Sequence, residues 1–225
     1  MKYLKIYFSI VLSIILLFLG SLYVYDPLYV FHKNWFTKEL HLNNNMRLQA
    51  AGILNNHEYD SLILGSSLFE NTSSNRASKS LGGKFINISL SGSGFYERKI
   101  FLDYALSKKN IKKVIYSMDP TYINLSKQHR NYPIETFNFL YDQNQFNDFK
   151  IYFNDKYLKC LYGFSQDNNC IGNKVSLDRP NAWYMQKRHT SRYGGIKNWF
   201  KMKHNKKMER MIRQAYDIKS RVMTT

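Results

Sequence analysis

A Gly-Ser-Ser turn follows directly on a short apolar segment in the first third of the chain. Leu62-Ile63-Leu64 is typical of a buried strand, and Gly65-Ser66-Ser67 comes immediately after it. A glycine permits a sharp turn at the end of a strand, and the hydroxyl that follows it then points out of the sheet edge. Hydrolases with an α/β fold present a nucleophilic serine at this position. The pattern therefore predicts attack by a serine hydroxyl on an acyl carbon, or else an ordinary turn with a serine helix cap.

A second polar turn lies further along the chain. Residues 85–88 are typical of a short strand, residues 89–94 of a loop rich in serine and glycine, and residues 95–108 of a helix. A third apolar run, residues 114–118, follows that helix. Strands that alternate with helices at this spacing form parallel sheets with crossover helices. The sequence therefore predicts an α/β fold with a parallel sheet.

These two turns resemble motifs of the SGNH (GDSL-type) hydrolase superfamily. The first motif of that family reads Gly-Asp-Ser, and its serine is the nucleophile, so the resemblance implies this role for Ser67. The second motif reads Asn-x-x-x-Ser-Gly, which Asn87 to Gly92 matches, and the resemblance implies that Gly92 donates a backbone N–H to the oxyanion hole. The likeness extends over residues 58–125. The Gly-Ser-Ser variant is similar to membrane-anchored relatives that handle acyl groups on cell-envelope polymers.

The resemblance implies a three-layer α/β/α (flavodoxin-like, SGNH-type) domain, of which this chain contains part. It also implies acyl-ester hydrolysis or O-acyl transfer on envelope polysaccharide. The third family motif, Gly-x-Asn, differs here, because residues 119–124 read Asp-Pro-Thr-Tyr-Ile-Asn. Asn124 comes three residues later than the family asparagine, and by resemblance it contributes to the oxyanion hole.

The last family motif, Asp-x-x-His, occurs nowhere in the 225 residues. A serine hydroxyl without a base is a poor nucleophile. We therefore expect little or no esterase activity from these residues alone, with the base supplied by a further C-terminal part. The alternative from a different class is a non-catalytic envelope protein with a degenerate SGNH-like fold.

The N-terminus predicts a membrane anchor. Residues 6–25 contain no charged side chain, and a run of about 20 apolar residues crosses a hydrocarbon core as a helix. A cleaved signal peptide is the alternative, but its apolar region would be shorter and would end in a small-x-small site. Lys2 and Lys5 are expected on the cytoplasmic side. The chain is therefore predicted to pass once through a bacterial inner membrane, with its C-terminal domain in the periplasm or outside.

The composition narrows the class of partner. The chain has 33 Lys and Arg against 16 Asp and Glu, which gives a formal net charge of +17. A charge this high on a cytoplasmic protein would suggest nucleic acid as its partner. The predicted membrane anchor argues against this partner, because it places most of the chain outside the cytoplasm. The inner membrane, anionic lipid headgroups and acidic envelope polysaccharide are the expected partners. Residues 187–225 are the most basic segment, and they suit either a basic amphipathic helix at a surface or an ordinary helix on a partner domain.

Cys160 and Cys170 are the two cysteines of the chain. In an exported protein such a pair is expected to form a disulfide. Metal ligands would have shorter spacings with further Cys or His nearby, so no metal and no cofactor is predicted. The predicted organisation is an anchor over residues 1–25, a juxtamembrane linker and helix over 26–57, an SGNH-like core over 58–130, a helical insertion with the disulfide over 131–186, and a basic segment over 187–225.

Overall fold

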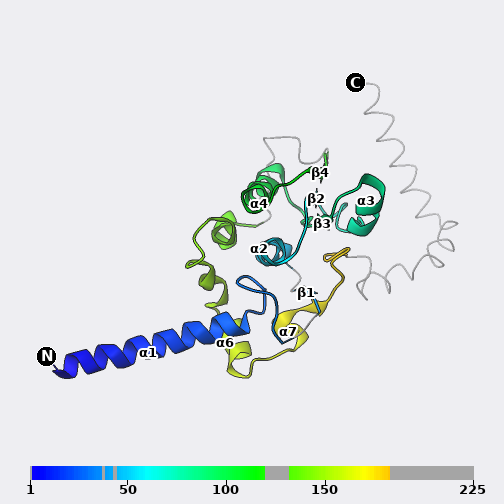
Figure 1. The fold of residues 1–225 in the computed structure, drawn as a ribbon. Helices are drawn as coiled ribbons and strands as arrows, with labels where there is room; N and C mark the ends of the chain where they lie inside the picture. Colours follow the sequence, from blue (N-terminus) through cyan, green and yellow to red (C-terminus); the bar gives the residue numbers. More distant parts are fainter. Residues whose placement is uncertain (1, 37–38, 43–44, 120–131, 183–225) are drawn as a thin grey trace. The chain divides into compact units, whose positions relative to one another are not determined.

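A computed structural model describes residues 2–36, 39–42, 45–119 and 132–182 (Figure 1). The chain divides into two compact units, Met1–Asn181 and Ala182–Thr225. The predicted basic segment and Asn124 lie outside the described residues. The elements in chain order are α1 (Lys2–Tyr25), β1 (His41–Leu42), α2 (Met46–Asn56), β2 (Ser61–Leu64), α3 (Ser74–Leu81), β3 (Phe85–Asn87), α4 (Phe95–Lys108), β4 (Lys113–Tyr116), η2 (Ile134–Thr136), η3 (Asn138–Tyr141), η4 (Asp148–Tyr152), α6 (Asp155–Tyr162), α7 (Asn168–Ile171) and β5 (Asn173–Lys174).

The first helix, α1, has 24 residues and is long and apolar enough to cross a membrane. Nearly all of its side chains are exposed, and only Leu22 and Tyr25 in its last turn are buried. The prediction of a membrane-length apolar helix at the N-terminus is confirmed in its extent and its composition.

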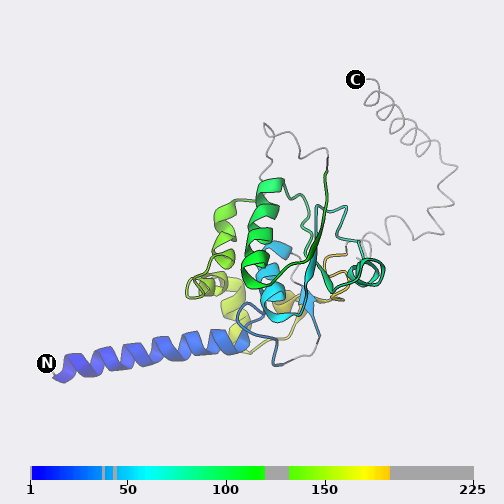
Figure 2. The ribbon, with the colours of Figure 1, turned by 45° about the horizontal axis from the view of Figure 1, so that its top comes forward.

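A small parallel sheet forms the centre of the domain. Its three strands stand in the order β3-β2-β4, with Leu62 of β2 opposite Ile86 on one side and Val114 on the other. Figures 1 and 2 show α2 and α4 on one face of this sheet and α3 on the other. The prediction of an α/β fold with a parallel sheet is confirmed, and the predicted helix over residues 95–108 has these bounds in α4.

The central strand β2 is buried on both of its faces, which explains its uninterrupted apolar run. Successive side chains of a strand point to opposite faces. Leu62 and Leu64 belong to the core cluster that also contains residues of α2 and α4, whereas Ile63 packs with Ala77 and Phe85 on the α3 side.

The segment that follows α1, which we predicted as a juxtamembrane linker, is packed into the domain. Residues 26–30 are all buried. The carboxylate of Asp26 accepts hydrogen bonds from the backbone N–H groups of residues 30–32 at 2.9–3.0 Å and from the hydroxyl of Tyr152. The helix end and the domain are therefore joined by buried contacts rather than by a solvated tether.

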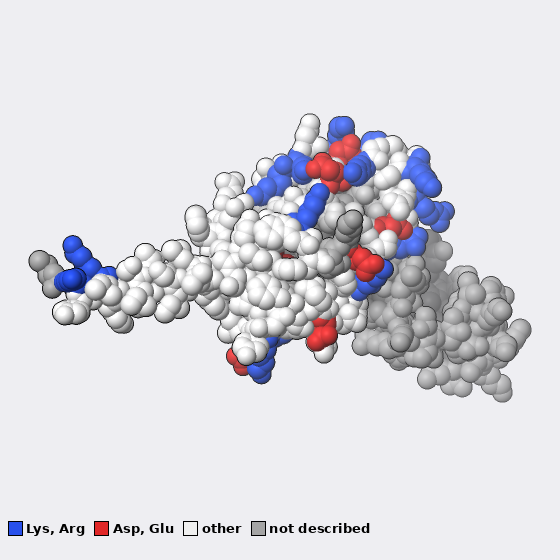
Figure 3. All heavy atoms as spheres, turned by 60° about the horizontal axis from the view of Figure 1, so that its bottom comes forward, with Lys and Arg blue, Asp and Glu red and all other residues white. Residues whose placement is uncertain are grey.

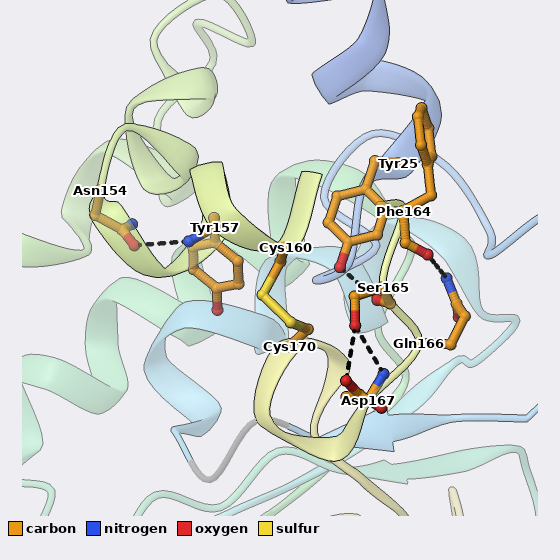
Figure 4. Close-up of a disulfide and its surroundings, with 9 residues drawn as sticks. All are labelled: Tyr25, Asn154, Tyr157, Cys160, Phe164, Ser165, Gln166, Asp167 and Cys170. Atoms are coloured by element: carbon orange, nitrogen blue, oxygen red, sulfur yellow. Dashed lines mark hydrogen bonds between the residues drawn. A yellow bond between two sulfur atoms is a disulfide. The ribbon is translucent and has the colours of Figure 1, made fainter. Parts of the chain in front are cut away.

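The predicted disulfide is present in the structure. Cys160 of α6 and Cys170 of α7 are bonded, with their Cα atoms 5.8 Å apart (Figure 4). Beside this bridge, the hydroxyl of Tyr25 at the end of α1 donates a hydrogen bond of 2.6 Å to the carbonyl oxygen of Ser165. The bridged loop thus contacts the C-terminal end of α1.

Candidate active site

The carboxyl ends of the three parallel strands meet at one edge, and a polar segment follows each of them. The N–H of Leu90 donates to the carbonyl oxygen of Gly65 at 2.8 Å, and the N–H of Ser117 donates to that of Leu64 at 3.0 Å. The chain leaves β2 toward α3 and leaves β3 toward α4, on opposite faces of the sheet. Open α/β sheets bind ligands at such a switch point.

Gly65 allows the close approach of strand and turn that this edge requires. A Cβ atom at this position would lie 2.7 Å from the Cβ of Ser117 and 2.8 Å from that of Phe69. The carbonyl of Ser66 then accepts a hydrogen bond from the N–H of Phe69 at 2.9 Å, which closes the turn. Ser66 is buried in this turn, whereas Ser67 is partly exposed. Ser67 is therefore the more accessible of the two serines.

The turn that contains Gly92 is held against the first turn. Gly92 has a φ of +63°, a left-handed conformation that favours glycine. The next residue, Ser93, is fully buried, and its hydroxyl donates to the carbonyl oxygen of Gly65 at 3.2 Å. The two glycine turns named in the sequence analysis are thus brought together by direct hydrogen bonds.

Arg98 of α4 binds the polar segments after β3 and β4 to each other. Its side chain is 0% exposed and donates hydrogen bonds of 2.7 Å to the carbonyl oxygens of Ser93 and Ser117. It also forms an ion pair of 2.7 Å with Asp119. Burial raises the pKa of Asp119, but hydrogen bonds from its neighbours, including Ser66 and Arg98, outweigh burial and hold the pKa below its usual range.

Glu70 brings a second carboxyl group to this edge. It is 3% exposed, and the side-chain amide of Asn181 donates a hydrogen bond of 2.6 Å to its Oε1. Burial raises the pKa of Glu70 to about 7, although the backbone N–H of Ser91 and the charge of Arg47 act in the opposite direction. A carboxyl group that titrates near neutral pH is suited to accept a proton in catalysis.

A buried ion pair supports the turn that precedes Gly92. Arg47 of α2 binds Glu97 of α4 through two hydrogen bonds, of 3.1 and 2.9 Å. The same guanidinium donates to the carbonyl oxygen of Ser91 at 3.0 Å. Arg47 therefore fixes the backbone beside Gly92 and acts as a positioning residue.

Asn87 has a structural place in this arrangement. Its side-chain amide donates to the carbonyl oxygens of Phe69 and Thr72 at 2.9 and 2.8 Å, and its Oδ1 accepts the N–H of Ser89 at 3.0 Å. This asparagine, the first residue of the second motif, binds the turn after β2 to the end of β3.

The described histidines have their contacts elsewhere. The ring of His32 lies 2.6 Å from the carbonyl oxygen of Tyr23, His41 lies beside Tyr29, and His57 ends α2 before the amino end of β2. No group of three or more His, Cys, Asp or Glu that could hold a metal is found among the described residues. A cavity of about 480 Å³ lies around residues next to the amino end of β2, lined by Tyr29, Lys33, Asn34, Glu39, Leu40, Asn56, His57, Val175 and Leu177.

Comparisons with known proteins give no relative: no family model, no curated protein and no solved structure matches this chain. The likeness to SGNH hydrolases therefore rests on the sequence motifs alone.

The sequence motifs predicted roles for Ser67 and Gly92 and gave no prediction for Glu70, Arg98 or Arg47. The available signal for Glu70 was its place three residues after Ser67, in the same turn. No local sequence pattern indicated Arg98 or Arg47, because each of them binds groups that are distant in the sequence.

Proposed function

We propose that this protein is a membrane-anchored, extracytoplasmic enzyme of the SGNH-hydrolase type that hydrolyses or transfers O-acyl groups on envelope polysaccharide. The observation that best supports this proposal is the meeting of the Ser67 turn and the Gly92 turn at the carboxyl edge of the sheet, joined by the 2.8 Å hydrogen bond from Leu90 to Gly65. In open α/β sheets this edge is the place where ligands bind.

In this proposal the hydroxyl oxygen of Ser67 attacks the acyl carbon, and Glu70 accepts the hydroxyl proton. The negative charge that develops on the acyl oxygen is stabilised by the N–H groups of Ser67 and Gly92, together with Asn124. The leaving alcohol then takes the proton from Glu70, and water or a sugar hydroxyl removes the acyl group from Ser67. Because Glu70 must be ionised to act as a base, turnover is expected to rise as the pH rises through about 7.

The helix α1 supports the proposed membrane location. This helix is apolar over the length of a hydrocarbon core, and Lys2 and Lys5 at its start favour the cytoplasmic side. The domain then lies outside the inner membrane. The formal net charge of +17 suits an acidic polymer or anionic lipid headgroups as its surroundings.

An assay on the full chain in detergent micelles tests the proposed chemistry. The sequence alone led us to expect little or no esterase activity, but with Glu70 proposed as the base we expect slow turnover of p-nitrophenyl acetate that Ser67→Ala abolishes. Ser80→Ala, which removes an exposed hydroxyl from α3, is the matched control and is expected to leave turnover unchanged. Equal turnover by the native chain and by Ser67→Ala would exclude Ser67 as the nucleophile.

The base is tested separately. Glu70→Gln keeps the shape of the side chain but cannot accept a proton, so it is expected to abolish turnover and the rise with pH. His129 and His189, which lie outside the described residues, are the other candidates. Loss of turnover in His129→Gln or His189→Gln, with turnover kept in Glu70→Gln, would transfer the role of base to that histidine.

The second candidate function is a non-catalytic envelope protein with a degenerate fold of this type. The ion pair of Arg98 with Asp119 favours it, because Asp119 starts the segment where the family has its third motif, and here that aspartate is engaged in a buried structural contact. On this reading the native chain and Ser67→Ala would both lack turnover and would bind acidic polysaccharide equally well.

A further inference from the structure

Aromatic side chains from three separate segments surround the last turns of α1. Phe18 stacks on Phe153, with ring centroids 6.2 Å apart and an angle of 13° between the planes. Tyr23 packs edge-on against Trp35, with ring centroids 6.2 Å apart. The aromatic collar, as we name this set, consists of Phe18, Tyr23, Trp35, Phe36, Phe153 and Phe164.

The collar is unusually exposed for aromatic residues that pack on one another. Trp35 is 60% exposed, Phe153 is 53% exposed, and Phe36 is 48% exposed. Figure 3 shows few charged side chains on the surface next to the base of α1 in that view. Exposed aromatic side chains that gather near one end of a helix in this way suit an interaction site.

The contact of Phe18 with Phe153 places the collar at a defined level along α1. Phe18 precedes the last residue of the helix, Tyr25, by seven positions, which corresponds to about 10 Å along the axis. Phe153 therefore lies beside the apolar part of the helix and not beyond its end. A bilayer whose headgroup region lies at the level of the last turns of α1 would reach Phe153.

The collar is held in place relative to α1 by buried contacts. Leu22 and Tyr25 are buried against the domain, and the Tyr25 hydroxyl binds the carbonyl oxygen of Ser165 (Figure 4). The Cys160–Cys170 bridge closes the loop that contains Ser165. The domain consequently cannot move away from the helix end without breaking these contacts.

We propose that the aromatic collar docks the domain on the bilayer, with its rings in the headgroup region of the leaflet in which α1 ends. The inference rests on the proposed anchoring of α1 in the membrane, and its partner is the phospholipid of that membrane. Tryptophan and tyrosine favour this interface because their rings are amphipathic. The collar then fixes the orientation of the domain on the membrane.

Fluorescence quenching by brominated phospholipids tests the docking on the full chain in phosphatidylcholine vesicles. Trp183→Phe with Trp199→Phe leaves Trp35 as the only tryptophan of the chain. We expect lipids brominated near the headgroup end of the acyl chains to quench most of its emission. The control adds Trp35→Phe and Tyr96→Trp, which moves the only tryptophan to an exposed position on α4. The brominated lipids are expected to leave the emission of this tryptophan unchanged.

Extraction with alkaline carbonate separates this inference from the anchoring itself. If the protein stays in the vesicles and Trp35 is not quenched, the collar does not touch lipid and the anchoring stands. If carbonate releases the protein, the anchoring fails and the docking fails with it. Equal quenching of Trp35 and of the Tyr96→Trp reporter would also overturn the inference, because the collar would then be no closer to lipid than α4.

A reporter at Phe153 gives an independent reading of the same surface. Phe153→Trp in the protein that lacks Trp35, Trp183 and Trp199 is expected to be quenched by the same lipids. Quenching at Phe153 together with quenching at Trp35 supports docking of the whole collar. Quenching at one of the two positions alone would contradict it.

Discussion

Arg98 joins the polar segments after β3 and β4 at the carboxyl edge of the sheet. Arg98→Met is expected to lower the free energy of unfolding by about 3–5 kcal/mol, because it leaves the buried Asp119 without its partner. Lys99→Met is the matched control at the next position. It removes an exposed ion pair with Asp103, and the expected change is below about 0.5 kcal/mol. Denaturant unfolding followed by circular dichroism measures both changes, and equal effects would show that Arg98 does not stabilise the edge.

Glu70 is expected to make the stability of the protein depend on pH. Its pKa is about 7 in the folded protein and about 4.3 in an unfolded chain. Between these values the folded protein binds more protons than the unfolded chain, so the free energy of unfolding falls as the pH rises. Glu70→Gln stays neutral and avoids this loss.

The measurement for Glu70 is the difference in the free energy of unfolding between Glu70→Gln and the native chain. This difference is expected to be near zero at pH 4 and to grow to about 3 kcal/mol in favour of the variant at pH 8. Comparing the variant with the native chain removes the contributions of other groups, such as Asp148, whose pKa burial also raises to about 7. A difference that does not change with pH would mean that Glu70 is ionised in the folded protein.

At the scale of single residues, the sequence predicted the serine and the glycine of the two turns and little else of the site. Gly65 to Ser67 and Ser91 to Gly92 are short contiguous motifs, which a sequence displays directly. The charged residues that support them act across the fold, as Arg47 does when it binds Glu97 and Ser91. Such contacts depend on the tertiary structure, so no local pattern indicates them.

At the scale of elements, the packing of β2 against β4 and the turn after β2 requires a glycine. Gly65→Ala is expected to lower the melting temperature clearly, because its Cβ would lie 2.7 Å from that of Ser117 and 2.8 Å from that of Phe69. Gly94→Ala is the control, since nothing lies within 4 Å of a Cβ there. Thermal unfolding of both variants measures the two melting temperatures. Similar melting temperatures for the two would show that the edge adjusts without strain.

The elements with a strong local pattern were predicted well, and the others were not. The helix α4 and the strand β2 follow from periodicity and from a continuous apolar run. The helical insertion predicted over residues 131–186 contains the short helices η2, η3, η4, α6 and α7 in its described part, and their bounds were not predicted. Short helices of this kind are set by the surfaces on which they pack rather than by propensity. The pairing of β1 with β5 joins strands that are far apart in the sequence and was not predicted.

At the scale of the whole molecule, the sequence indicated the apolar helix but not the buried contacts that join the end of this helix to the domain. The chain after the helix was predicted as a juxtamembrane linker and helix over residues 26–57. In the structure Asp26 is buried and accepts hydrogen bonds from the segment that follows it and from Tyr152. A buried carboxylate with several donors holds a loop as firmly as apolar packing does, and its partners lie too far along the chain to be recognised in the sequence.

The central claim is that Ser67 is the nucleophile of a membrane-anchored acyl-ester enzyme. Labelling of the full chain in detergent micelles with a fluorophosphonate, followed by mass spectrometry of the peptides, tests it most directly. We expect a phosphonylated peptide whose modified residue is Ser67, formed slowly, and no such adduct in Ser67→Ala. A native chain that stays unlabelled under conditions in which a control serine esterase is fully labelled would contradict the claim, and so would an adduct that persists in Ser67→Ala.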